Sequence, residues 1–475
     1  MNRRILVALA GFSGCSSMAA LYARIDRDLE AGRPNEAVAT LEGRQWSFGS
    51  HSQVLYSMEL GMLQHIAEQY SESNQSLTRA EDLSDALYTH RITSEAEAFL
   101  TNDTALPYEG EDFEKVMLNI LMMINYADLG MLDDALVEAR KVDHKLSILN
   151  DRNGGKTSYS KDPLARYFSG MLYEAAGDLN NALVAYRLAY DAFQQARKLY
   201  GTPVPDLLRA DLLRLSEAMG LTDEHQEYRT AFPGIAWRKA AETKDLAELI
   251  FVAGEGRAPM KRDMFIDVPF SRQALAVVLA TKGVIYPNYS DHRAAQSVLY
   301  GLTGRVMRIA VPKFVPRPSR VSQADAIVSS GSTHFDAHLA LMEDVTAIAV
   351  KDLDERIVRT TVKAVARAAW KFALAEGVRV GVQSAVGRPH GGELVGTIAG
   401  ALAHVAAVGT EEADKRSWAT LPDRIQVGRV LVPPGTYDIE LRWRGRAGEE
   451  VAKQPLRRVA LKAGEKRFIS TREMQ

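Results

Sequence analysis

The chain of 475 residues contains a single cysteine, Cys15. One thiol excludes an internal disulfide, a CxxC redox pair and a zinc site built from several cysteines. Charge of either sign is not in excess, because 58 basic residues face 60 acidic ones and the formal net charge is −2. Domains that bind nucleic acid are usually basic, so we expect no nucleic acid partner.

The sequence also lacks the short signatures of common catalytic and nucleotide-binding sites. It contains no HExxH, no GxSxG and no P-loop. Gly254 and Gly256 begin a G-x-G pattern, but Pro259 stands where a dinucleotide-binding turn has its third glycine. We therefore expect a protein that needs no cofactor and is not an enzyme.

Histidines give only weak indications of chemistry. His334, Asp336 and His338 form an H-x-D-x-H pattern, which would place two imidazoles on one face of a helix and could ligate zinc. No third ligand of suitable geometry is evident, and the preceding serines favour a polar helix start, so we predict no metal site. His390 lies beside two glycines, where a loop histidine could act as an acid or base, but no partner carboxylate accompanies it.

The N-terminus has the layout of a secretory signal. Arg3 and Arg4 precede an apolar run at residues 5–12, which is far shorter than the roughly 20 residues of a membrane-spanning helix. The run leads into the tetrapeptide FSGC at residues 12–15. This tetrapeptide resembles a bacterial lipobox, in which the cysteine is acylated and becomes the first residue of the mature protein.

The lipobox resemblance implies a signal peptide over residues 1–14 and a lipid anchor on Cys15. Several acyl chains hold a protein stably on a membrane, whereas one chain holds it only marginally. The mature protein would then lie on the periplasmic face of the cell envelope. Ser16 follows the cysteine, and a residue other than aspartate at that place resembles outer-membrane sorting in enteric bacteria. The alternative is a buried helix start with an incidental cysteine.

Residues 15–235 are predicted to form a TPR-like α-helical repeat domain. Apolar residues recur there at spacings of three and four, and proline is scarce. The clearest unit, residues 166–186, has the G-x-x-Y and A-x-x-x-aromatic spacings of a tetratricopeptide (TPR) repeat. Gly170 and Ala182 in this unit are small enough to let two antiparallel helices approach closely.

Weaker units accompany this one. Turns are predicted at Gly32, Gly130 and Gly220, and Gly61 precedes Leu77 at a spacing that suits a second helix pair. The turns do not recur at a fixed period, so the array is divergent. Stacked helix pairs form a concave surface that holds a peptide or protein. We expect this groove to hold another envelope protein; the alternative is a helical domain that binds nothing.

Residues 236–475 are predicted to form a mixed α+β domain with antiparallel strands. Runs of β-branched and aromatic residues between turn signals predict strands at 248–254, 264–268, 306–311, 429–432, 437–443, 458–461 and 466–470. The turn residues Pro433, Pro434 and Gly435 predict that the strands on either side of them form a hairpin.

A helical block is predicted between these strands, at about residues 332–411. Its long helix carries a basic stripe whose members mostly lie four residues apart and share one face: Arg356, Arg359, Lys363, Arg367 and Lys371. The stripe is a candidate face for a partner or for an anion such as lipid or cell-wall polymer; the alternative is a solvated face, or pairing with acids elsewhere in the fold. Residues 394–408 are almost wholly apolar but short for a membrane span, so we predict a helix packed inside the domain or against a second copy.

Taken together, the lipobox, the TPR-like half and three further segments resemble a family of proteobacterial TPR-containing lipoproteins that has no assigned activity. The segments are residues 254–259, 414–422 and 431–437. The resemblance implies a membrane-anchored periplasmic scaffold or assembly factor. The alternative is a periplasmic hydrolase that acts on cell wall or polysaccharide and gathers acids or histidines at a pocket of the C-terminal domain.

Overall fold

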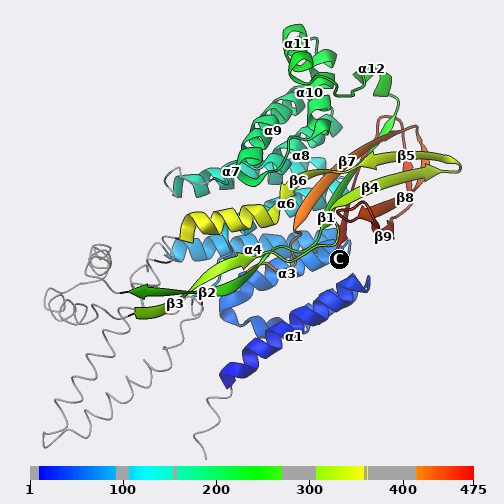
Figure 1. Ribbon diagram of the computed structural model, residues 1–475. Helices are drawn as coiled ribbons and strands as arrows, with labels where there is room; N and C mark the ends of the chain where they lie inside the picture. The colour runs from blue at the N-terminus through cyan, green and yellow to red at the C-terminus, as the bar shows by residue number, and fades with distance from the viewer. Residues whose placement is uncertain are drawn as a thin grey trace, which may run out of the picture.

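The computed structural model of the protein describes residues 10–91, 106–152, 154, 158–269, 306–357, 361 and 413–474. Helices make up the first half of the chain, and strands dominate the second (Figure 1). The predicted fold class, an α-helical array followed by an α+β region whose strands are mostly antiparallel, is confirmed.

Successive helices of the first half pair as hairpins. The pairs are α1 (Ala10–Glu30) with α2 (Pro34–Glu42), α3 (Gln53–Ile66) with α4 (Tyr70–Arg91), α6 (Asp112–Asp128) with α7 (Leu132–Arg152), α8 (Pro163–Ala175) with α9 (Leu179–Tyr200), and α10 (Asp206–Ala218) with α11 (Thr222–Ala231). Shorter elements are the 3-10 helices η1 (Gln45–Phe48) and η2 (Ser50–Ser52) and the α-helix α12 (Ala240–Thr243). Each hairpin presents an apolar face to its neighbours, as in other helical repeats.

The turns within the hairpins follow a common design. Gly177 ends α8 with φ at 80°, a left-handed conformation that glycine adopts without steric cost. Asp178 then caps α9, because its carboxylate accepts a hydrogen bond of 3.0 Å from the N–H of Asn181. The α3–α4 turn differs, since Glu68 holds the positive φ of 59°. Gly32, Gly130 and Gly220, which the sequence places in turns, also have positive φ values. These predicted turns are confirmed.

Small residues set the spacing between paired helices, as predicted. A Cβ atom on Gly170 of α8 would lie 2.3 Å from the ring of Tyr186 of α9, and Ala182 in the same pair is fully buried. A Cβ atom on Gly61 of α3 would lie 2.6 Å from the side chain of Leu77 of α4. Any larger residue at either glycine would push the two helices apart.

The described strands form two sheets and a ribbon. They are β1 (Ala247–Glu255), β2 (Met260–Pro269), β3 (Val306–Val315), β4 (Gln323–Ser330), β5 (Thr333–His338), β6 (Ala340–Asp344), β7 (Arg424–Val432), β8 (Gly435–Arg444), β9 (Glu450–Pro455), β10 (Val459–Leu461) and β11 (Lys466–Glu473). The first sheet has the order β11-β1-β7-β6, the second has β10-β8-β4-β5 with β9 beside β8, and β2 pairs with β3. Among these strands only β1 and β11 pair in parallel.

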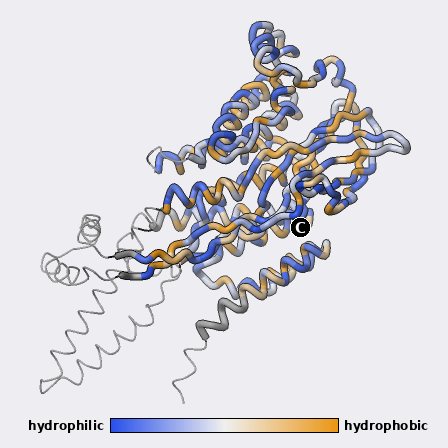
Figure 2. Tube along the Cα trace, in the orientation of Figure 1, coloured by the Kyte–Doolittle hydropathy of each residue, from blue (hydrophilic) through white to orange (hydrophobic). Residues whose placement is uncertain are grey.

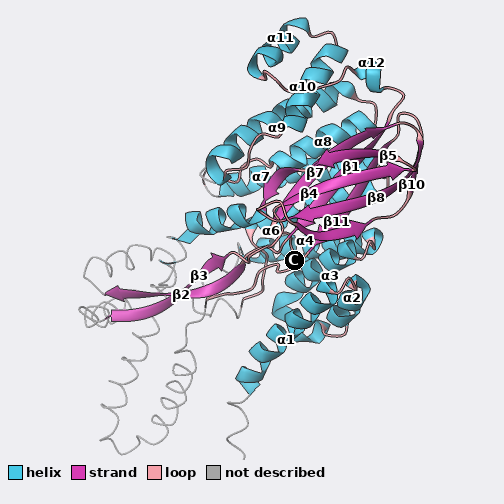
Figure 3. Ribbon diagram, turned by 45° about the vertical axis from the view of Figure 1, so that its right-hand side comes forward, coloured by secondary structure: helices cyan, strands magenta, loops and turns pink. Residues whose placement is uncertain are grey.

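The first sheet lies between the helices and the second sheet. Strand β1 is buried along its whole length, because both of its faces are covered. Ile250 and Val252 point into the core shared with the helices, whereas Leu249 and Phe251 point into the core between the two sheets. Figure 3 shows the stacked strands beside the helical array, and Figure 2 shows hydrophobic and hydrophilic residues alternating along them.

The predicted helical block is wrong at its start. Thr333 to Asp344 form the strands β5 and β6, and a helix begins only at residue 345 and is described to residue 357. Along β5, half-buried residues alternate with exposed ones, which is the period of a strand. Residues 362–411 lie outside the described residues, so the prediction for 394–408 stays a prediction. No described helix is long and apolar enough to cross a membrane.

The hairpin predicted around Gly435 is also wrong. Strand β7 pairs with β1 and β6 of the first sheet, whereas β8 pairs with β4, β9 and β10 of the second. Pro433 and Pro434 have no N–H groups to donate to a ladder. The chain therefore crosses from one sheet to the other at this point, where the sequence predicted a direct return.

Candidate functional site

The inner face of the array, meaning the surface of α3, α6, α8 and α10 that faces the sheet, contacts the C-terminal half of the same chain. Helix α6 packs on β11 and helix α8 on β6. Phe168 of α8 and Phe468 of β11 have ring centroids 5.2 Å apart. The sequence predicted that the groove of the array holds another protein. The predicted location of the partner is wrong, because the chain's own sheet covers this face of the array.

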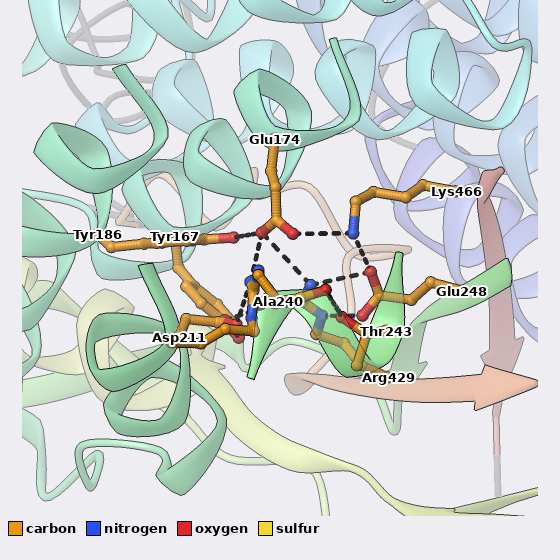
Figure 4. Close-up of polar contacts among 10 residues, drawn as sticks. Tyr167, Glu174, Tyr186, Asp211, Ala240, Thr243, Glu248, Arg429 and Lys466 are labelled. Atoms are coloured by element: carbon orange, nitrogen blue, oxygen red, sulfur yellow. Dashed lines mark hydrogen bonds and ion pairs between the residues drawn. The ribbon is translucent and has the colours of Figure 1, made fainter. Parts of the chain in front are cut away.

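Arg429 of β7 is the centre of an ion-pair network at this contact, which we call the junction network (Figure 4). Its guanidinium group lies 2.5 Å from Asp211 of α10 and 2.6 Å from Glu248 of β1. The same group lies 3.5 Å from Glu174 of α8. One buried arginine therefore bridges two helices of the array and the central strand of the first sheet.

Two further cations complete the junction network. Lys466 of β11 lies 2.9 Å from Glu174 and also contacts Glu248. Arg214 of α10 lies 2.7 Å from Glu174 and 2.8 Å from Asp211. The hydroxyl groups of Tyr186 and Tyr167 donate hydrogen bonds to Glu174 and Asp211, at 2.9 Å and 2.8 Å. Every carboxylate of the network has at least one cationic partner, so its charges are balanced.

Glu174 and Glu248 of the junction network stay ionised at neutral pH. Burial raises the pKa of Glu174, but the attraction of Arg429 and the other two cations outweighs burial and holds this pKa well below its usual range. For Glu248 the same opposition, with Arg429 and Lys466 as the main cations, lowers the pKa to about 2. A general acid needs a proton to donate at the working pH, so these two carboxyls are unsuited to that role.

A cavity of about 540 Å³ lies beside the junction network. Leu179, Trp237 and Phe335 contribute apolar walls, and the network contributes a charged side. This is the type of acid cluster that the hydrolase alternative predicts. Its carboxylates are nevertheless held by arginine and lysine, so the arrangement favours fastening the sheet to the array over hydrolysis.

A second contact holds the segment that precedes β7. Glu59 of α3 accepts hydrogen bonds from the backbone N–H groups of Ala419 and Thr420, at 2.8 Å and 3.2 Å. Glu114 of α6 accepts one from the N–H of Trp418, at 2.7 Å, and the indole of Trp418 is fully buried. Burial raises the pKa of Glu59 to about 7. The inner face thus binds the turn before β7 through carboxylates.

A third contact joins α6 to β11. Asp128 at the end of α6 accepts a hydrogen bond of 3.0 Å from the backbone N–H of Ser470. The hydroxyl groups of Ser470 and Tyr70 lie 3.3 Å apart. Together with the junction network and the carboxylates of Glu59 and Glu114, this contact closes the inner face along α3, α6, α8 and α10.

A second groove, which we call the outer groove, lies on the array away from the residues of these three contacts. It has a volume of about 460 Å³ and lies between α4 and the α6–α7 turn. Its lining consists of Ser71, Asn74, Gln75, Thr78, Arg79, Asp82, Tyr126, Leu129 and Met131. Leu129 and Met131 are 41% and 45% exposed, so the groove offers an incoming segment two neighbouring apolar side chains.

The basic stripe predicted from the sequence is corrected at the member that the structure describes. Arg356 is 2.5 Å from Glu111 of the array and 2.6 Å from Asp352 of its own helix. This side chain is therefore committed to a contact between helices and does not offer a free charge to an anion. Arg359, Lys363, Arg367 and Lys371 lie outside the described residues.

Cys15 and the histidine pattern have different outcomes. The backbone of Cys15 belongs to helix α1, and its acylation stays a prediction. His334, Asp336 and His338 lie on β5 rather than on a helix, and His338 contacts the carboxylate of Asp325. Within the described residues, no group of three or more acids, histidines or cysteines could hold a metal ion.

Several of these residues could not be identified from the sequence as parts of one site. Glu59, Glu114, Glu174 and Asp211 lie at charged positions of helices that are otherwise apolar on the same face. That pattern indicates a buried charge in need of a partner. Arg429 is the partner of Glu174 and Asp211, and the backbone of residues 418–420 is the partner of Glu59 and Glu114. All of these partners are separated from the acids by more than about two hundred residues, so no spacing rule connects them.

No protein-family model matches the chain, and no curated protein matches its sequence. Among solved structures, MamA has 12% identity and a TM-score of 0.27, covering 43% of this chain and 90% of its own. The Rap conjugation gene regulator of plasmid pLS20, in complex with the Phr* peptide, has 15% identity and a TM-score of 0.30, covering 48% and 56%. TPR-like repeats of a Podosopora anserina putative kinesin light chain have 15% identity and a TM-score of 0.31, covering 46% and 94%. The TPR-like character of the array rests on its own hairpins.

Proposed function

We propose that the protein is a lipoprotein, anchored through Cys15 to the periplasmic face of a membrane, with the outer membrane favoured. In this proposal it acts as a TPR-type scaffold or assembly factor for another envelope protein. The lipobox-like tetrapeptide at residues 12–15 and the hairpin array support it. A tethered array would present a binding surface close to the membrane, and stacked repeats form extended binding surfaces of this kind.

The observation that carries the proposal is the contrast between the inner face of the array and the outer groove. The chain's own sheet covers the inner face, whereas the outer groove is unfilled in the described structure. We therefore place the partner at the outer groove. Its size lies in the range of sites that hold a small ligand or a short segment, so the expected occupant is a segment of the partner rather than a domain face.

The lining of the outer groove indicates the chemistry of that segment. Four uncharged polar residues of α4 share one helical face: Ser71, Asn74, Gln75 and Thr78. Their amides and hydroxyls both donate and accept hydrogen bonds, as does the backbone of an extended peptide. Leu129 and Met131 provide an apolar contact, and one acid accompanies one base. The expected occupant is a neutral segment with an apolar side chain.

A photo-crosslinking experiment tests the proposed binding face. A benzophenone amino acid at Gln75, in the otherwise intact lipoprotein, should crosslink one envelope protein in living cells. Met131→Asp should abolish that adduct, because the charge would lie in the apolar part of the groove. The matched control carries the probe at Val184, which is exposed on α9 outside the groove. Adducts of equal yield from both positions, or an adduct unaffected by Met131→Asp, would contradict the proposal.

The anchor has a separate test. Cys15→Ala removes the thiol that an acyl chain requires, so the variant should lack the acyl mass and keep its signal peptide uncleaved, and any membrane association that remains should be through the uncleaved signal. Membrane fractionation and the mass of the purified protein measure both effects. A variant that remains in the membrane with its signal removed would show that Cys15 is not the anchor. The crosslinking result at Gln75 would still be informative in that case, because it tests the binding groove and not the anchor.

A further inference from the structure

Two buried carboxyl groups meet where the array contacts the first sheet. Asp162 immediately precedes α8 and Glu343 lies in β6, and both are buried. Their side chains are within hydrogen-bonding reach of each other, and α8 packs on β6. Among the described residues no lysine, arginine or histidine forms an ion pair with either carboxyl. This pair therefore differs from the junction network, in which each acid has a cation.

The surroundings of Asp162 favour its ionised form. One carboxylate oxygen accepts a hydrogen bond of 2.6 Å from the N–H of Ala165 in the first turn of α8, and the other accepts one of 2.6 Å from the hydroxyl of Tyr159. The N-terminus of a helix also attracts negative charge. Glu343 has less support, because among the described residues the one donor near it is the hydroxyl of Tyr159, which already donates to Asp162.

The groups that face Glu343 add no positive charge. They are Asp162 and Tyr159 before α8, Tyr200 at the end of α9, and Asp344 in the same strand. Asp344 lies 3.6 Å from Arg424 of β7, and Asp143 of α7 lies 2.9 Å from Arg166 of α8. In the helix at residues 345–357, Asp352 is paired with Arg356 and Glu355 accepts the N–H of Ser158. An ionised Glu343 would thus be an uncompensated buried charge.

A shared proton resolves this conflict. A protonated Glu343 can donate its O–H to Asp162, which keeps spare lone pairs on both oxygens. Burial and then the charge of Asp162 raise the pKa of Glu343 well above its usual range. Burial also raises the pKa of Asp162. The two carboxyls behave as one unit that retains a single proton.

We propose that Asp162 and Glu343 form a carboxyl latch, which holds the first sheet against the array while they share a proton and weakens that contact when the proton is lost. Because the folded pKa is raised, the stabilisation is fully present below the unfolded pKa and is lost as pH rises through the folded pKa. Alkaline conditions would therefore loosen β6 from α8 and expose this part of the inner face.

The test compares Glu343→Gln with the wild type across pH. The amide keeps the shape and a hydrogen-bond donor but cannot ionise. The melting temperature of the variant minus that of the wild type should rise steadily from about pH 5 to about pH 9, reaching several degrees. The difference is the proper readout, because Glu59 and Glu255 also have pKa values raised to about 7 and tilt both profiles equally. Asp336→Asn on β5, an exposed acid, should show no such trend.

Two further measurements separate a latch from other roles. At one alkaline pH, amide hydrogen exchange in β6 and the first turn of α8 should be faster in the wild type than in Glu343→Gln. Where Glu343→Gln does not fold, Glu343→Met, which also cannot ionise, serves in its place. A constant difference in melting temperature across pH would overturn the latch. So would a melting temperature of the wild type, but not of the variant, that rises on adding calcium chloride, since the pair would then hold a cation.

Discussion

Replacing Arg429 with methionine is expected to lower the free energy of unfolding by about 3–5 kcal/mol at neutral pH, because it leaves buried acids without their central cation. Methionine fills a similar volume, so the loss reports charge rather than a cavity. Glu174, Asp211 and Glu248 would then face one another with only Lys466 and Arg214 between them. Urea unfolding followed by circular dichroism measures the change.

The acid side of the pH profile gives this prediction a distinctive sign. The pKa of Glu248 is lowered to about 2 by its cations, against the effect of burial, and that of Glu174 is also lowered. Lowered values stabilise the fold above the unfolded pKa, and this contribution is lost as pH falls through the folded pKa. The deficit of Arg429→Met relative to the wild type should therefore shrink in acid.

The control for Arg429→Met is an arginine in an exposed ion pair. Arg458 lies 3.3 Å from Asp438, and both side chains are largely exposed. Arg458→Met should change the free energy of unfolding by less than about 0.5 kcal/mol. Equal losses for the two variants, or a deficit of Arg429→Met that grows in acid, would contradict the assigned role of the junction network.

Trp418→Ala is the second substitution with a large expected effect. The indole is fully buried under the inner face, and removing such a side chain costs about 3–5 kcal/mol of unfolding free energy. Trp418→Phe should lose much less, because the indole N–H has no hydrogen-bond partner among the described residues that the substitution would remove. The order of the two variants therefore tests packing separately from hydrogen bonding.

Trp46 provides the control for Trp418. It is 70% exposed on η1, so Trp46→Ala should change the unfolding free energy by less than about 0.5 kcal/mol. Hydrogen exchange should also speed up over residues 413–421 in Trp418→Ala, because Glu59 and Glu114 would hold a less anchored segment. A Trp418→Ala variant as stable as Trp46→Ala would show that this segment does not pack on the array.

Local patterns in the sequence were sufficient to predict the helical array. Gly170 and Ala182 lie in two helices of one hairpin, so their contact joins segments that are close in sequence. Glycine at a hairpin turn is predictable because it adopts a positive φ without steric cost. Strand β1 was equally predictable from the sequence, since a strand that is covered on both faces is rich in apolar residues. These features depend on contacts between residues that are close in sequence or on burial that the composition already reveals.

The errors arose where tertiary contacts decide the structure. β5 has few apolar residues, because it lies at an edge of the second sheet and is largely exposed, and its polar pattern resembled a helix start. The turn before Gly435 has hairpin chemistry, yet β7 and β8 belong to different sheets. The local sequence cannot distinguish a return to the same sheet from a crossing to another.

The site itself was beyond prediction for a related reason. Asp211 and Arg429 are 2.5 Å apart in space but separated by 218 residues in the chain. Glu343 and Asp162 carry no pattern that marks them as partners. Arg356 was assigned to a surface stripe, whereas its charge is used inside the molecule. Charged residues of these kinds are ambiguous until the fold brings their partners together.

Carbodiimide crosslinking of the intact chain tests most directly the claim that its own sheet closes the inner face. This reagent joins a lysine to a carboxylate only where the two are in contact. Lys466 lies 2.9 Å from Glu174 across the junction, and Lys145 lies 2.6 Å from Glu81 within the array. The two lysine side chains are matched in exposure, at 17% and 16%.

The account predicts that peptide mass mapping of the crosslinked monomer finds both isopeptide bonds, Lys145 to Glu81 and Lys466 to Glu174. The first bond confirms that the reagent reaches a half-buried pair of this kind. Recovery of the Lys145–Glu81 bond, with Lys466 joined only to Glu248 of its own sheet, would contradict the closed inner face.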